Sequence, residues 1–177
     1  MEYLHSYDSP LGRLTLAATN QGLSGLWIEG QKYFAAFLSS EHEEKSLPVF
    51  DETAAWLDRY FQGEKPGALP PLDLHGSPFR RAVWEVLLTI PYGQVTTYGE
   101  IAKFLSAKSG RAGMSAQAVG GAVGHNPVSI LVPCHRVVGA DGSLTGYAGG
   151  VEKKLWLLKL EGADVSKLFL PNRGTAL

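Results

Sequence analysis

Residues 126–137 read NPVSILVPCHRV and include Cys134, the single cysteine of the 177-residue chain. The apolar run at 128–132 predicts a strand end or a turn that opens into a pocket. A cysteine thiol is only a few per cent thiolate at neutral pH, so a nucleophilic cysteine needs a base or a positive charge beside it. His135 and Arg136 follow Cys134 directly and supply both.

The same residues also have an inert interpretation. Neighbouring residues on a strand point in opposite directions, so a contact between Cys134 and His135 requires a turn or a bridging water. Lone Cys-His pairs are usually coincidental. A single cysteine can form neither an internal disulfide nor a multi-cysteine zinc site, so Cys134 must act as a lone thiol and we expect no metal there.

Three helices are predicted upstream of the cysteine, each with its own start signal. Those signals are Ser77 before Pro78, the capping box Thr97-x-x-Glu100, and Ser115 before the run at 116–123. The first helix should end near Ile90-Pro91. The second and third are joined by a loop rich in Gly and Ser, so they resemble a helix-turn-helix whose loop is longer than usual.

The third predicted helix is rich in small residues, which let a helix approach another backbone closely. They are Ala118, Gly120, Gly121, Ala122 and Gly124. The neighbour that approaches can be another part of the protein or the groove of a nucleic acid, and the pattern favours neither.

A last helix is predicted at 151–160. Its apolar residues Leu155, Trp156, Leu158 and Leu160 are expected to pack against the core. The helix should end at Glu161-Gly162, where a solvated glutamate is the ordinary interpretation.

The first third of the chain predicts a small antiparallel sheet and one helix. Residues 14–17 and 23–28 alternate at strand period, and residues 51–61 have helical spacing. A stretch rich in Gly and Pro follows at 62–77. We therefore expect an α/β fold: a small N-terminal α/β domain and linker over 1–75, and a mainly helical C-terminal domain with the helix-turn-helix over 76–177.

The composition is that of an ordinary folded protein, 45% hydrophobic and 19% charged. No stretch approaches the roughly 20 apolar residues of a membrane span, and the polar start Met1-Glu2-Tyr3 lacks the apolar core of a signal peptide. We expect a cytoplasmic monomer that does not contact a membrane.

The net charge of −1 conceals an uneven distribution. Residues 1–75 carry a net charge of −6, residues 76–137 carry +4, and the remainder carries +1. A basic segment of this size is compatible with a phosphate-binding surface, and also with a solvated face that has no partner.

The segment around Cys134 resembles the active-site signature of O6-alkylguanine-DNA alkyltransferases. The resemblance is carried by NPVSILVPCHRV at 126–137, PYGQVTTY at 91–98, AVGGA at 118–122 and GYAGG at 146–150. It continues through WLL at 156–158 to Glu161-Gly162, and so covers roughly residues 77–162 in order. The acidic first third resembles the family's N-terminal domain only in length and strand character.

The resemblance implies that Cys134 is the alkyl acceptor and attacks the carbon attached to O6 of guanine. His135 would act as its base through a water, with Glu161 orienting the imidazole. Tyr98 would hydrogen-bond or protonate the departing guanine, and Asn126 would hold the turn beneath the cysteine. The transfer would be irreversible and would need no cofactor, because a thioether offers water no easy leaving group.

The resemblance also implies a substrate pocket and a surface for double-stranded DNA. The pocket residues would be Val137, Tyr147, Ala148 and Gly149. The DNA-binding residues would be Arg111, Ser115, Ala116, Gln117, Ala118, Gly120, Gly121 and Arg136. The second helix of the helix-turn-helix would enter the minor groove, and the alkylated guanine would be flipped out of the duplex at a cost of a few kcal/mol.

Each assigned residue also has a purely structural interpretation. Tyr98 and Tyr147 could be half-buried core residues, Asn126 a turn former and Arg136 a member of a structural ion pair. Three other functions stay open for the whole chain: a non-catalytic alkyltransferase-like protein, which would lack the cysteine; a sequence-specific transcription regulator; and a thiol hydrolase.

The sequence departs from the family pattern in three places. Gln117 occupies the position where an arginine would fill the vacated base stack, and Arg111 lies six residues upstream. The loop at 104–115 is longer than in the family, and Ala148 replaces the serine of some members. These departures bear on DNA affinity and on the range of alkylated bases, including O4-alkylthymine, and leave the nucleophile unchanged.

Replacing Gln117 by arginine should tighten binding to duplex DNA, because glutamine fills space without contributing a positive charge. The measurement is the affinity for one duplex at one fixed salt concentration. An unchanged affinity would show that this position does not fill the vacated stack.

Overall fold

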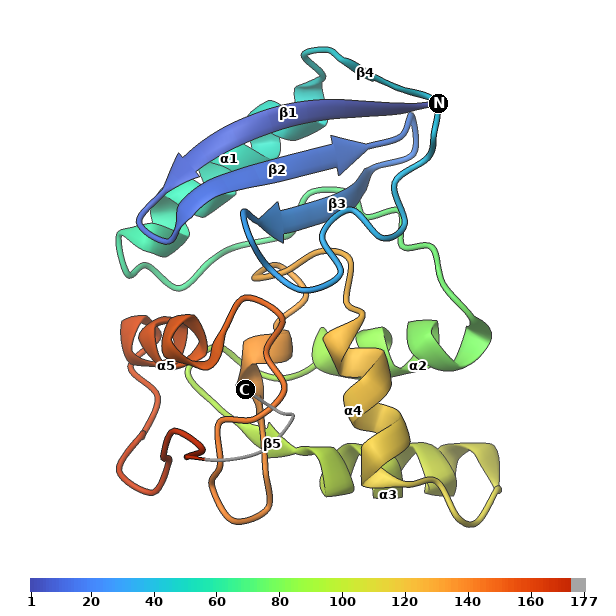
Figure 1. Cartoon of the computed structure of the whole chain (residues 1–177), viewed down its shortest axis with the longest axis vertical. Coiled ribbons are helices and arrows are strands. Elements are labelled where there is room, and N and C mark those ends of the chain that lie inside the picture. The colour runs from blue at the N-terminus through green and yellow to red at the C-terminus, as the bar shows by residue number, and fades with distance from the viewer. Residues whose placement is uncertain (173–177) are drawn as a thin grey trace. The chain divides into compact units, whose positions relative to one another are not determined.

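The computed structural model describes residues 1–172, which divide into two compact units (Figure 1). The first unit comprises residues 1–75 and 127–131, and the second comprises 76–126 and the residues from Val132 onward. The domain boundary predicted after residue 75 placed residues 127–131 in the second domain, whereas they belong to the first unit. This return has a main-chain cause: the Leu26 amide donates to the Pro127 carbonyl (2.8 Å), and the Ser129 amide donates to the Leu26 carbonyl (3.0 Å).

The first unit contains a four-stranded sheet with the order β3-β2-β1-β4. The strands are β1 (Glu2–Ser9), β2 (Gly12–Ala18), β3 (Leu23–Ile28) and β4 (His42–Glu44). The first three pair antiparallel, as expected, whereas β4 pairs parallel with β1. Strand β3 is buried along its whole length, and the returning segment 127–131 hydrogen-bonds to its residue Leu26.

Helix α1 (Pro48–Phe61) lies along one face of this sheet (Figure 1). It begins three residues before the predicted start, with Pro48 at its first position, where the missing N–H of proline costs nothing. Its buried side chains include Trp56 and Tyr60, whose rings stack with centroids 5.2 Å apart. The α/β character predicted for the first unit is therefore confirmed.

The second unit is mainly helical. Its elements are α2 (Pro78–Leu87), β5 (Thr96–Thr97), α3 (Tyr98–Ser109), α4 (Ala116–Gly124), the 3-10 turn η1 (Cys134–Arg136), β6 (Val137–Val138) and α5 (Val151–Leu160). Strands β5 and β6 form a short parallel pair. Among residues 1–172 no helix combines the length and the apolar character that a membrane crossing needs.

The predicted start signals all cap their helices. The Ser77 hydroxyl accepts a hydrogen bond from the Arg80 amide, and the Ser115 hydroxyl accepts one from the Ala118 amide. Thr97 and Glu100 form both halves of a capping box at the start of α3. This box fixes the first turn of the helix, and Tyr98 is its first residue.

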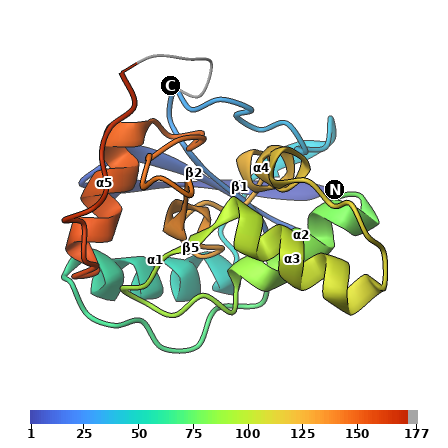
Figure 2. The same ribbon diagram turned by 90° about the horizontal axis from the view of Figure 1, so that it is seen from below.

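Helices α2, α3 and α4 pack together, and α5 lies on the other side of the unit (Figure 2). The indole N–H of Trp84 in α2 donates to the carbonyl of Ala122 in α4 (2.8 Å), inside the core. Helix α3 ends at Gly110, whose φ of +66° suits glycine, and residues 111–115 connect it to α4. The longer connection of this helix-turn-helix therefore follows an ordinary glycine C-cap.

Of the two structures predicted for residues 128–132, the turn is the one that forms, at residues 129–131. No strand is present there: Val128 makes a single bridge with Leu26, and Ile130 is buried with a φ of +73°. The predicted buried face of α5 was wrong in part, because its buried residues are Val151, Lys154, Leu157 and Leu158, and Trp156 is 38% exposed. The prediction used apolar residues alone, which left Lys154 out of the buried face.

Replacing Thr97 by alanine should lower the free energy of unfolding by about 1 kcal/mol, because the Glu100 amide loses its acceptor. Urea denaturation of the full chain measures this loss. Thr97→Ser keeps the hydroxyl and is the matched control. Equal stability of the alanine variant and the natural protein would show that the capping box contributes nothing.

Candidate active site

Cys134 is the first residue of the 3-10 turn η1. Its amide donates to the Val132 carbonyl (2.8 Å), and the Arg136 amide donates to the Pro133 carbonyl (3.0 Å). The strand geometry that would separate Cys134 from His135 is therefore absent here, because the chain turns at the cysteine. The thiol is buried, with 5% of the residue exposed.

The side chain of Asn126 supports this turn from the end of α4. Its amide nitrogen donates to the Val132 carbonyl (2.8 Å), and the amide also hydrogen-bonds to the sulfur of Cys134. Asn126 is itself buried. The geometry places it where the resemblance located it, between the end of α4 and the cysteine.

Opposing effects act on the pKa of the Cys134 thiol. Burial is the largest and raises the pKa, because the thiolate loses its hydration. The Asn126 hydrogen bond, the positive charge of Lys154 and nearby main-chain amides lower it, and burial outweighs them. The resting side chain is therefore a protonated thiol that needs a base before it can attack.

The base candidate, His135, is completely buried and contacts Glu161. Its Nε2 lies 2.7 Å from Oε1 of Glu161. Burial lowers the pKa of His135 more than the carboxylate raises it, so the imidazole is neutral at pH 7. When Nε2 carries the proton that faces Glu161, Nδ1 is the nitrogen able to accept a second proton. This is the arrangement that a general base for Cys134 requires.

Glu161 is buried and is not a solvated helix-end residue. Its carboxylate accepts hydrogen bonds from Nε (2.9 Å) and Nη2 (2.9 Å) of Arg136 and from the Gly93 amide (3.1 Å). Burial alone would raise its pKa, but His135 and Arg136 outweigh burial and hold the pKa well below its ordinary range. Glu161 is therefore ionised and links the turn at Gly93 to η1.

Arg136 does not have the position of a DNA contact. Its guanidinium is buried, and its Nη1 donates to the Ile90 carbonyl (2.7 Å) while the other two nitrogens bind Glu161. A side chain held in this way cannot reach a phosphate without leaving a buried carboxylate uncompensated. The geometry agrees with the structural ion pair and corrects the assignment of Arg136 to the DNA surface.

Tyr98 lies close to the cysteine, at the start of α3. Its hydroxyl donates to the Thr145 carbonyl (2.7 Å), and the absence of a side chain at Gly146 leaves room for it, because an added Cβ would lie 2.8 Å from that hydroxyl. Burial is the largest cause of its raised pKa, followed by the charge of Cys134. Tyr98 is therefore a hydrogen-bond donor and a weak acid.

The expected pocket residues follow the loop before α5. Tyr147 is buried, and its hydroxyl has no hydrogen-bond partner among residues 1–172; burial is the largest cause of its raised pKa. Ala148 and Gly149 are half-buried. Val137 pairs with Thr96 and is fully buried, so its side chain belongs to the core and not to an accessible pocket wall.

Lys154 is a residue of this site that the sequence analysis missed. The side chain is fully buried in α5, and its Nζ donates to the Thr145 carbonyl (2.8 Å), which also accepts from Tyr98. Burial lowers its pKa to about 8, against the opposing effect of Cys134. The available signal was its spacing: Lys154 is three residues from Val151 and three from Leu157, on the apolar face of the helix.

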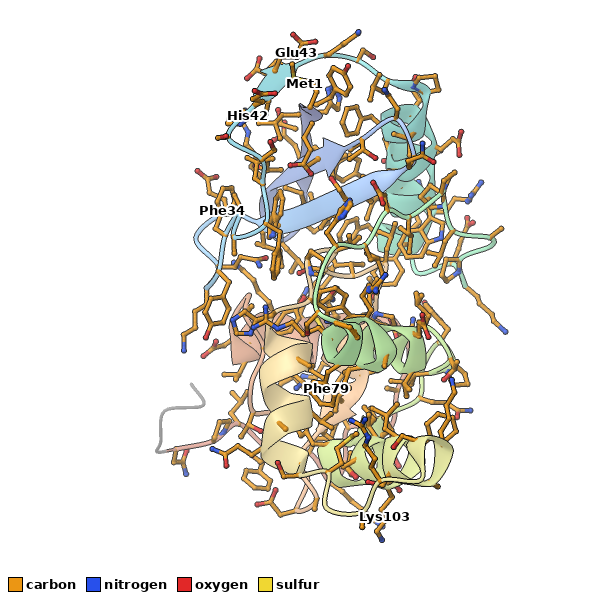
Figure 3. All side chains as sticks on the ribbon, turned by 90° about the vertical axis from the view of Figure 1, so that its right-hand side faces the viewer. Met1, Phe34, His42, Glu43, Phe79 and Lys103 are labelled. Atoms are coloured by element: carbon orange, nitrogen blue, oxygen red, sulfur yellow. The ribbon has the colours of Figure 1, made fainter. Side chains whose placement is uncertain are left out.

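Most of the expected DNA-binding residues are exposed at the start of α4 and in the loop before it. These are Arg111, Ser115, Ala116, Gln117, Ala118 and Gly121. Gly120 is half-buried, and an added Cβ there would lie 3.8 Å from the Tyr98 ring. The helix therefore packs within the protein at Gly120 and leaves other small residues exposed. Lys103, on the preceding helix α3, is also exposed and projects away from the ribbon (Figure 3).

Replacing Glu161 by glutamine should lower the free energy of unfolding by about 3 kcal/mol at pH 7, because a buried Arg136 loses its counter-charge. The pKa of Glu161 is lowered in the folded state, so its contribution is complete above the ordinary value of 4.5 and is lost as the pH falls through the folded-state value.

The stability difference between the natural protein and Glu161→Gln should accordingly shrink below about pH 5. Urea denaturation at several pH values measures it, with Glu152→Gln as the control on an exposed position of α5. A difference that stays constant into the acid range would show that the carboxylate charge is not the stabilising feature.

Two family models match the chain. Residues 3–74 match the ribonuclease-like domain of 6-O-methylguanine DNA methyltransferase, and residues 78–163 match the DNA binding domain of the same family. The methylated-DNA–protein-cysteine methyltransferase of Mycobacterium tuberculosis is 44% identical over 91% of this chain and 93% of its own length. The corresponding protein of Methanosarcina acetivorans is 40% identical over 91% of this chain and 99% of its own.

The fold is also similar to solved structures. The crystal structure of Mycobacterium tuberculosis OGT in complex with DNA has a TM-score of 0.79 and 41% sequence identity, over 94% of each chain. The crystal structure of Mycobacterium tuberculosis O6-methylguanine methyltransferase has a TM-score of 0.77, also at 41% identity. Sequence and fold agree over nearly the whole length, and the chain belongs to the 6-O-methylguanine DNA methyltransferase family.

Proposed function

We propose that this protein repairs DNA by transferring the alkyl group of O6-alkylguanine to Cys134, irreversibly and once per molecule. The observation that carries the proposal is the arrangement of three buried side chains: the thiol of Cys134, the neutral imidazole of His135 beside it in η1, and the carboxylate of Glu161 bound to that imidazole. This is the nucleophile, base and orienting group of covalent catalysis in a thiol version.

The transfer begins with removal of the thiol proton. His135 accepts it through a bridging water, and Glu161 stabilises the resulting imidazolium. The thiolate attacks the alkyl carbon, a sulfur–carbon bond forms, and the bond from carbon to O6 breaks with its electron pair moving to guanine. The product thioether is stable to water, so the protein is consumed, and the chemistry needs no cofactor.

The departing guanine needs a hydrogen-bond donor for its developing charge. Tyr98 fits this role because its hydroxyl is held at the Thr145 carbonyl, and a guanine in the pocket would replace that acceptor. The raised pKa of Tyr98 favours hydrogen bonding over full proton transfer. The buried Tyr147 hydroxyl is a second polar group that a bound base would satisfy.

The partner is double-stranded DNA from which the alkylated base is flipped out. Helices α3 and α4 form the helix-turn-helix, and the exposed side chains from Arg111 to Ala118 are its contact surface. The DNA complex of the Mycobacterium tuberculosis relative supports DNA binding. In this chain Gln117 would enter the vacated stack without a charge, which favours weaker duplex binding than an arginine would give.

The two domains would divide these tasks. Residues 76–177, including 173–177, which lie outside the described residues, would form the alkyltransferase domain, and residues 1–75 would form the N-terminal domain with its linker. The protein would act as a cytoplasmic monomer. O4-alkylthymine, which also carries its alkyl group on an exocyclic oxygen, is the second base to test.

Intact-mass measurement after mixing with a duplex that carries one O6-methylguanine tests the transfer. We expect one added methyl group per chain, in proportion to the lesion and saturating at one, because the chain has one cysteine. Cys134→Ser should bind the same duplex and gain no mass.

The control separates transfer from recognition. Lesion-dependent binding without added mass would make the protein a damage-recognition factor with an inactive cysteine. Methyl transfer at the normal rate in Cys134→Ser would refute the role of Cys134, and regeneration of the free thiol would indicate a hydrolase.

A further inference from the structure

Lys154 carries a charge in a place where charges are normally excluded. Its side chain is completely buried among the apolar residues of α5 that face the core, Val151, Leu157 and Leu158. A buried ammonium is costly unless an anion compensates it. None of the ion pairs of residues 1–172 includes Lys154. The compensation must therefore come from another kind of group.

The groups that face Lys154 come from three surrounding segments: the loop at Thr145, helix α3 and the turn η1. The Thr145 carbonyl accepts from its Nζ at 2.8 Å, and the ring of Tyr98, on α3, lies 5.8 Å from Nζ. The charges of Lys154 and Cys134, on η1, act on each other: the lysine lowers the thiol pKa, and the cysteine raises the lysine pKa. Lys154 also lowers the pKa of His135.

Cys134 is thus the group near Lys154 that gains a negative charge during the reaction. The carboxylate of Glu161 is already paired with Arg136 and His135. Tyr98 stays protonated because its pKa is raised, and so does Tyr147. A thiolate at Cys134 would be the anion that the buried ammonium lacks in the resting protein.

We propose that Lys154 is a positioning residue that supplies the positive charge stabilising the Cys134 thiolate, and that the Thr145 carbonyl shared with Tyr98 holds that charge in place. The inference deepens the proposed alkyl transfer and rests on it. Lys154 gives up no proton: the thiol proton goes to His135, sulfur binds the alkyl carbon, the carbon–O6 bond breaks, and guanine finally holds the proton in place of the alkyl group. The ammonium is unchanged at the end.

The test compares Lys154→Met, which removes the charge, with Lys154→Arg, which retains it. The chain has a single cysteine, so thiolate absorbance in the ultraviolet, corrected with Cys134→Ser, titrates Cys134 alone. We expect the thiolate titration of Lys154→Met to move to higher pH, with at least about tenfold less thiolate at any pH below its midpoint, since a nearby opposite charge shifts a pKa by roughly 1–3. Lys154→Arg should stay within about threefold of the natural protein.

A second readout is the single-turnover transfer rate from an O6-methylguanine duplex as a function of pH. The rise of the rate with pH should move to higher pH in Lys154→Met by the same amount as the thiolate titration. Lys159→Met, at an exposed position of the same helix, is the control and should leave both curves unchanged. If Lys154→Met does not fold, Lys154→Gln repeats the test. Glutamine removes the charge but can still donate a hydrogen bond to the Thr145 carbonyl.

A folded Lys154→Met or Lys154→Gln protein whose thiolate titration matches the natural protein would overturn the inference. A loss of stability without that shift would do the same, because it would make Lys154 a packing residue. The thiolate titration needs no DNA, so it gives its answer even when the natural protein fails to accept a methyl group, which would instead refute the proposed function.

Discussion

The buried carboxylate of Glu161 is the constraint on which the rest of the site depends. A carboxylate inside a protein is stable only when its charge and its lone pairs are compensated. Here the partners come from separate stretches of chain: Arg136 and His135 in η1, and the amide of Gly93 in the turn after α2. Satisfying one carboxylate therefore fixes the cysteine turn against the end of α5. The same contacts keep Glu161 ionised and orient a neutral His135.

Cys134 lies between groups with opposite roles. Burial keeps the thiol protonated, which protects a nucleophile that can be used only once. His135 and Glu161 provide a destination for its proton, and Lys154 provides a positive charge near the sulfur. Asn126 joins these groups to α4, because its amide contacts both the sulfur and the Val132 carbonyl. Reactivity is therefore a property of the whole buried cluster.

Helix α4 connects the exposed surface proposed to contact DNA with this cluster. Its exposed residues include Gln117 and Gly121, whereas Gly120 packs close to the ring of Tyr98. Tyr98 in turn shares the Thr145 carbonyl with Lys154. Under the proposed function, this helix would approach a groove of DNA with one face and would contact, with another, the tyrosine that meets the flipped guanine. Small residues would serve both purposes because each requires close approach.

Local signals in the sequence predicted the starts of α2, α3 and α4, the strands β2 and β3 in outline and the cysteine motif, because caps, alternation and turn residues act over a few neighbouring positions. It also located Cys134, His135, Asn126, Tyr98 and Glu161 through the family resemblance. Long-range contacts were needed to show that Arg136 belongs to a buried ion pair, that Lys154 faces the core, and that residues 127–131 return to the first unit. Each of these depends on partners distant in the sequence, such as Glu161, Thr145 and Leu26. The local sequence pattern predicts that a charged residue is exposed to solvent. Its burial becomes stable only through pairing with residues distant in the sequence, which the local pattern does not contain.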